Sequence, residues 1–90
     1  MSTLATKTDE RVKNVSFLND NLVVDLMDGR IISVPIVWFP RLLNASTDAL
    51  NKWEISAGGY GIHWHEIDED LSTEGLLRGT AAQIHFARSA

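Results

Sequence analysis

The sequence contains no cysteine among its 90 residues, which excludes disulfides, thiol catalysis and thiolate metal sites. Long apolar runs are also missing. The longest, at residues 34–40, is far shorter than the roughly 20 residues needed to span a bilayer. The polar residues at the N-terminus lack the apolar stretch of a secretory signal peptide. We therefore expect a cytoplasmic protein that does not contact membranes.

Basic residues are few and scattered. Eight lysines and arginines against twelve acidic residues give a formal net charge of −4. Direct nucleic-acid binding is not expected, because it requires a concentrated basic face. The 44% hydrophobic and 22% charged content is typical of a globular protein. We expect one α+β domain at residues 11–80, with a flexible leader at 1–10 and a tail at 81–90.

Apolar and polar residues alternate in three segments near the N-terminus, at residues 12–18, 22–27 and 31–34. This pattern predicts β-strands, and the intervening Asn19–Asn21 and Asp28–Gly29 are turn signals. With a two-residue Asp28–Gly29 loop, the resulting meander has one apolar face: Val15, Phe17, Leu22, Val24, Leu26 and Ile31. The opposite face is mixed: Asn14, Ser16, Val23, Asp25, Arg30, Ile32 and Val34.

Short helices are predicted after this meander. One covers residues 37–45, with Pro40 in its first turn, where a missing N–H costs nothing. A second begins at Ser46 or Thr47, as an N-cap, and places Leu50 and Trp53 on one face.

The C-terminal half has weaker patterns. A glycine-rich turn at 57–61 precedes a short fourth strand at 62–65, and a last helix begins at Asp70 or Ser72 and ends at Gly79. Ile84 and Phe86 fit either the core or the tail. The predicted fold is a small antiparallel meander sheet of three to four strands packed against two or three short helices.

Two histidines and four carboxylates fall within residues 63–70. In a strand, the imidazoles of His63 and His65 would share a face, and Asp68 or Asp70 could complete the shell of a divalent metal. The same carboxylates would also suit a helix N-terminus. A small metal-dependent enzyme using His63, Asp68 and Asp70 is therefore one alternative function.

Several features favour a binding role over catalysis. No nucleophile motif is present, and a domain of this size has little room for a pocket, so we expect no catalytic residue, no enzyme activity and no cofactor. Arg41 is expected to pair with the acidic run at 68–70. We predict a protein-interaction surface from aromatic and charged residues: Trp38, Phe39, Arg41, Trp64, Glu66, Asp68, Glu69 and Asp70.

Four motifs together resemble the bacterial domain of unknown function 2442 family over about residues 12–79: Asp28-Gly29-Arg30, Trp38-Phe39-Pro40-Arg41-Leu42, Asp68-Glu69-Asp70-Leu71-Ser72 and Glu74-Gly75-Leu76-Leu77. The chain departs from the family pattern at His65, where proline is more common. The resemblance implies a small α+β unit with an antiparallel sheet on short helices. It does not imply a metal site at His63 and His65.

The resemblance also bears on partners. Many such domains resemble one half of a toxin–antitoxin pair, encoded beside another small protein, and some resemble a module fused to a DNA-binding helix-turn-helix domain. We expect an antitoxin-like or regulatory protein-interaction module whose partner is a small protein encoded nearby. A component of a DNA-linked transcriptional regulator is a second alternative, beside the metal-dependent enzyme. A homodimer is also expected to be possible, because an open sheet leaves edge strands with unpaired backbone groups.

Overall fold

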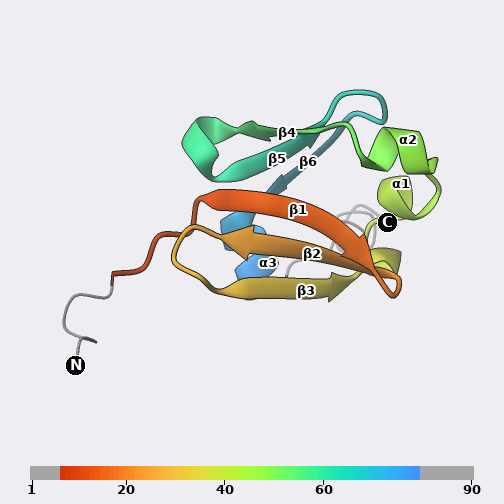
Figure 1. The fold of residues 1–90 in the computed structure, drawn as a ribbon. Helices are drawn as coiled ribbons and strands as arrows, with labels where there is room; N and C mark the ends of the chain where they lie inside the picture. The colour runs from red at the N-terminus through yellow and green to blue at the C-terminus, as the bar shows by residue number, and fades with distance from the viewer. Residues whose placement is uncertain (1–6, 80–90) are drawn as a thin grey trace, which may run out of the picture.

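Two three-stranded antiparallel sheets and three short α-helices form the part of the chain, residues 7–79, that the computed structural model describes (Figure 1). The first sheet has the order β1 (Val12–Leu18), β2 (Asn21–Leu26), β3 (Ile31–Pro35). The second has the order β4 (Trp53–Ser56), β5 (Gly61–Trp64), β6 (Glu69–Ser72). The α+β class is confirmed, although two sheets replace the single predicted one.

The turn between β1 and β2 follows the prediction. Asn19 and Asp20 have φ values of 52° and 65°, as a two-residue type I′ turn requires. Phe17 is thereby paired with Leu22, and Val15 with Val24. Because directly opposed residues share a side of the sheet, the predicted apolar face is confirmed for these two strands.

The loop between β2 and β3 is one residue longer than predicted. The N–H of Leu26 donates to the carbonyl oxygen of Arg30 at 2.9 Å, and Gly29 has a φ of 97°. This is a three-residue loop that ends in a glycine with positive φ. Ile31 therefore lies opposite Asp25 rather than Leu26.

A shift of one residue reverses the two faces of β3. Ile32 and Val34 point into the core, whereas Ile31 is 66% exposed. The prediction that placed Ile31 inside and Ile32 and Val34 outside was wrong, because it assumed the shorter loop.

The predicted helix at 37–45 is divided in two. A 3₁₀ turn, η2 (Ile36–Trp38), is followed by α1 (Pro40–Leu43). Phe39 separates them with an extended backbone, and Pro40 occupies the first helical position, as expected. In α2 (Thr47–Leu50), the Ser46 hydroxyl accepts a hydrogen bond from the N–H of Ala49 at 3.1 Å, which confirms Ser46 as an N-cap.

Strands β4 and β6 were not predicted. Trp53, expected on the second helix, begins β4, and the acidic run interpreted as a helix N-terminus forms the β5–β6 turn and β6. The glycine-rich turn contains η3 (Ala57–Gly59), whose residues all have positive φ.

The last helix, α3 (Thr73–Arg78), is capped by Ser72 and ends at the left-handed Gly79, as predicted. Ile84 and Phe86 lie outside the described residues. Within residues 7–79, no helix has both the length and the apolar character needed to cross a bilayer.

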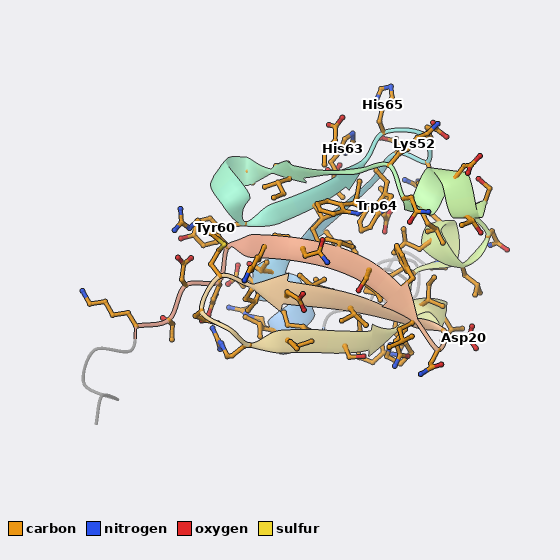
Figure 2. The ribbon with its side chains drawn as sticks, viewed as in Figure 1. Asp20, Lys52, Tyr60, His63, Trp64 and His65 are labelled. Carbon is orange, nitrogen blue, oxygen red and sulfur yellow. The ribbon has the colours of Figure 1, made fainter. Side chains whose placement is uncertain are left out.

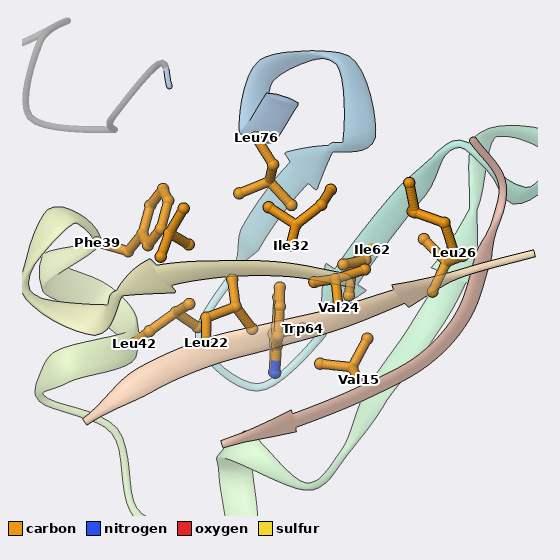
Figure 3. Close-up of a cluster of buried hydrophobic side chains, with 12 residues drawn as sticks. Val15, Leu22, Val24, Leu26, Ile32, Phe39, Leu42, Ile62, Trp64 and Leu76 are labelled. Carbon is orange, nitrogen blue, oxygen red and sulfur yellow. The ribbon is translucent and has the colours of Figure 1, made fainter. Parts of the chain in front are cut away.

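Side chains from both sheets, α1 and α3 form one buried hydrophobic cluster (Figure 3). Trp64 on β5 is fully buried, and its indole N–H donates to the carbonyl oxygen of Leu50 at 3.0 Å. This bond satisfies the one polar group of the indole and ties the end of α2 to β5. The second sheet is thereby anchored to the core through its middle strand, which leaves its outer face open.

Candidate interaction surface

The outer face of the second sheet carries a cross-strand row of ionisable side chains. Glu54 on β4 and Asp70 on β6 both lie opposite His63 on the middle strand β5. The neighbouring residues on β5, Ile62 and Trp64, are buried, so the row faces solvent. Figure 2 shows His63 and His65 pointing away from the core.

His63 is hydrogen-bonded within this row. Its Nδ1 lies 2.8 Å from Oδ1 of Asp70. The Asp70 side chain is 68% exposed and that of His63 is 26% exposed. The pair is therefore accessible from solvent and does not lie inside a closed cavity.

We define the acidic surface as Glu54, Glu66, Asp68 and Asp70 together with His63 and His65. Its carboxylates come from β4, β6 and the turn between β5 and β6. At the turn, Asp68 has a φ of 52°, a left-handed conformation that aspartate tolerates better than most residues. The turn thus presents Glu66 and Asp68 beside the two strand residues.

Cations near this surface are already engaged. Lys52 Nζ lies 2.8 Å from Oε2 of Glu66. Arg41 on α1 donates from Nη1 to the carbonyl oxygen of Asp68, and the same nitrogen lies 3.8 Å from Oε1 of Glu69. The predicted pairing of Arg41 with the acidic run is confirmed, and it fixes α1 against the β5–β6 turn.

Glu69 is the buried member of the acidic run, with 8% of its surface exposed. It lies opposite Trp64 on the inner side of the sheet. Burial raises the pKa of its carboxyl group, the positive charge of Arg41 acts in the opposite direction, and Asp70 and Asp68 raise it further. Glu69 therefore lies on the inner side of the second sheet, behind the acidic surface, and is not one of its exposed carboxylates.

The residues predicted as metal ligands, His63 and His65 with Asp68 or Asp70, are not arranged as a three-ligand group. The rings of His63 and His65 have centroids 6.1 Å apart. However, no group of three histidine, aspartate or glutamate side chains within residues 7–79 is arranged to hold one ion. An enzyme that uses His63, Asp68 and Asp70 as three protein ligands therefore has no support in this geometry.

Three residues of the predicted interaction surface proved to be internal. Phe39 and Trp64 are fully buried, and Glu69 is nearly so. Trp38 is half-buried and packs edge-on against Phe39, with ring centroids 6.5 Å apart. These three side chains present little surface to a partner, because they lie on the inner side of the second sheet or in the core.

The remaining residues of the prediction, Arg41, Glu66, Asp68 and Asp70, are exposed. Sequence reasoning missed Glu54, which completes the row with His63. The alternation of apolar and polar residues at 53–56 is the local signal of this strand, but four residues are too few to separate a strand from a helix.

Comparison with known proteins gives a family but no activity. The family described as "Protein of unknown function (DUF2442)" matches residues 12–82. A crystal structure of a protein of unknown function from Rhodospirillum rubrum is 34% identical, with a TM-score of 0.70 over 80% of this chain and 89% of that one.

An uncharacterised protein from Chromobacterium violaceum, solved by NMR, has a TM-score of 0.71 over 87% of this chain and 75% of that one. At 23% identity it shows a shared fold. No functionally curated protein matches the chain. Since the family match covers most of the sequence and both meander and acidic turn lie within it, this chain belongs to the DUF2442 family of proteins of unknown function.

Proposed function

We infer that this protein is a small protein-interaction module that binds a basic segment of another small protein through the acidic surface. The observation that carries this proposal is the outward row of Glu54, His63 and Asp70 on the second sheet. Such a row lies on a rigid strand scaffold, so its charges are held in place before a partner arrives.

The charge balance of the surface favours a basic partner. Within residues 7–79, Glu54, Asp68 and Asp70 form no ion pair with a lysine or arginine, whereas Lys52 and Arg41 are both engaged. Like-signed carboxylates gathered on one face create a negative potential that attracts cationic side chains. Lysine and arginine residues of a partner would therefore find carboxylates that are not already neutralised.

The same charges disfavour nucleic acid at this face, because phosphate groups would be repelled. The family resemblance, in which such domains are encoded beside another small protein, supports an antitoxin-like or regulatory role. The natural test partner is accordingly the product of the adjacent gene.

Co-expression with that gene product, followed by size-exclusion chromatography, tests the proposal. We expect one co-eluting complex whose affinity falls as salt is raised, because exposed charge pairs are screened. Separate elution of two folded proteins at low salt would contradict it.

A charge-matched pair of variants locates the surface. Neutralising Glu54 and Asp68, as Glu54→Gln with Asp68→Asn, should weaken the complex about tenfold, if each exposed charge contributes up to about 1 kcal/mol. Asn is tolerated at positive φ, so the turn at residue 68 should persist. The control, Asp20→Asn with Asp25→Asn, changes the net charge equally but lies on the first sheet and its β1–β2 turn, and it should leave the affinity unchanged. Equal weakening by both pairs would show that only net charge matters.

A further inference from the structure

His63 and His65 present two imidazoles on one side of the second sheet. Their ring centroids are 6.1 Å apart, and the ring planes are inclined at 62°. A zinc–nitrogen bond is about 2.0–2.1 Å long and the ring centroid lies about 1 Å farther back, so two imidazoles on one tetrahedral ion have centroids about 5.2 Å apart. The observed separation is about 1 Å larger than that, so the rings must approach slightly to share an ion. Because the His65 side chain is exposed, rotation about its side-chain bonds can bring it closer.

Asp70 orients the first of these rings. Its Oδ1 lies 2.8 Å from Nδ1 of His63. A carboxylate at this position favours the proton on Nδ1, which leaves the lone pair of Nε2 available. The same carboxylate–histidine arrangement holds metal-binding histidines in proteins and raises their basicity. His63 is therefore prepared as a metal ligand by a residue that does not itself touch the metal.

The surroundings also favour a cation. Glu54 flanks His63 on the other neighbouring strand, and within residues 7–79 it forms no ion pair with a lysine or arginine. Neutral imidazole suits zinc, copper and nickel, whereas magnesium and calcium prefer oxygen ligands. Two protein ligands leave the remaining positions of such an ion to water.

We propose that His63 and His65 form a two-histidine site for a divalent transition-metal ion, with Asp70 as the positioning residue for His63. The inference concerns the isolated chain and does not depend on a protein partner. With only two protein ligands, the site exchanges its ion readily and is open to solvent on one side. It is a site for reversible binding.

Isothermal titration of the untagged protein with ZnCl₂ or NiCl₂ at pH 7.5 tests the site. We expect one ion to bind with a dissociation constant below about 100 μM. His63→Ala and His65→Ala should each raise the dissociation constant at least tenfold. Asp70→Asn should raise it about tenfold, the lower end of the roughly 10–100-fold that outer partners of ligating histidines contribute.

An exposed carboxylate in the β1–β2 turn provides the control. Asp20→Asn removes the same charge as Asp70→Asn and should leave the affinity unchanged. In NMR spectra, substoichiometric Ni²⁺ should broaden the ring signals of His63 and His65 before those of Tyr60. No binding below about 100 μM, or equal loss of binding in Asp20→Asn, would overturn the proposal. A circular-dichroism spectrum unchanged from that of the parent shows that a variant is folded, so that weaker metal binding reflects the missing side chain.

Discussion

Two adjacent isoleucines provide a direct test of the β2–β3 register. Ile32 is 9% exposed and lies opposite the fully buried Val24, whereas Ile31 is 66% exposed and lies opposite Asp25. In the register that a two-residue loop would impose, the two residues would exchange faces. The substitutions Ile31→Ala and Ile32→Ala remove the same atoms from neighbouring positions, so their difference reports burial.

The expected cost is large at one position and small at the other. Truncating a buried isoleucine to alanine costs about 2–5 kcal/mol, through lost transfer free energy and the cavity left behind. Ile32 contributes to the buried hydrophobic cluster (Figure 3). We therefore expect Ile32→Ala to lower the free energy of unfolding by about 3 kcal/mol. An exposed substitution changes stability by about 0.5 kcal/mol or less. Ile31→Ala should therefore differ from Ile32→Ala by at least about 2 kcal/mol.

Urea unfolding, followed by tryptophan fluorescence, measures both values. With a slope of roughly 1–1.5 kcal/mol per molar urea, the midpoint for Ile32→Ala should fall by about 2–3 M. A domain of this size has a total stability of about 5–13 kcal/mol. If Ile32→Ala does not fold, the Ile→Val pair gives a smaller version of the same contrast, about 0.5–1.5 kcal/mol at a buried position. Equal losses, or a larger loss at Ile31, would refute the three-residue loop.

Three further substitutions have defined outcomes. Gly29→Ala should cost about 1–2 kcal/mol in thermal or urea unfolding, because Gly29 has a φ of 97° with open space around it; an unchanged midpoint would contradict that backbone. Glu69→Gln should be more stable than the parent at pH 7 and equal to it below pH 4: burial raises the Glu69 pKa above 4.5, so the parent loses stability as the pH rises through that value. A gap that persists at pH 3 would exclude this cause. Asp28→Asn should destabilise at pH 7, with the difference shrinking in acid. The side-chain hydrogen bond from Arg30, with backbone hydrogen bonds, lowers the Asp28 pKa, so the stability that it confers is present above pH 3.8 and lost as the pH falls. Acid titrations of both proteins by circular dichroism would measure the difference, and a constant gap down to pH 2 would count against it.

Turns and helix ends were predicted correctly from local sequence where the backbone conformation suits only a few residue types. The Asn-Asp pair between β1 and β2, the Ser46 and Ser72 caps, and the terminal Gly79 were all recognised from sequence. In each case a short side chain bonds to nearby backbone, or the conformation has positive φ, and few residues suit either condition. These features need no distant contact to form.

The candidate site was less predictable. His63 and Asp70 were recognised as neighbours in sequence, but their hydrogen bond depends on β6 lying beside β5. Glu54 reaches the same row only because residues 53–56 extend the second sheet. Short segments of four residues carry too weak a periodicity to distinguish strand from helix, so the sheet itself, and with it the acidic surface, was not apparent.

The sequence by itself determined the family, the α+β class, the first hairpin and the ends of α3, because these depend on local conformation and on the alternation of apolar residues. Tertiary structure alone decided which face of β3 is buried, which aromatic residues are internal, and which carboxylates meet His63. A loop longer by one residue exchanges the buried and exposed faces of the following strand without changing its amino-acid composition. Pairing between strands depends on long-range contacts that no local pattern encodes, which is why the acidic run became part of a sheet surface and not a helix cap.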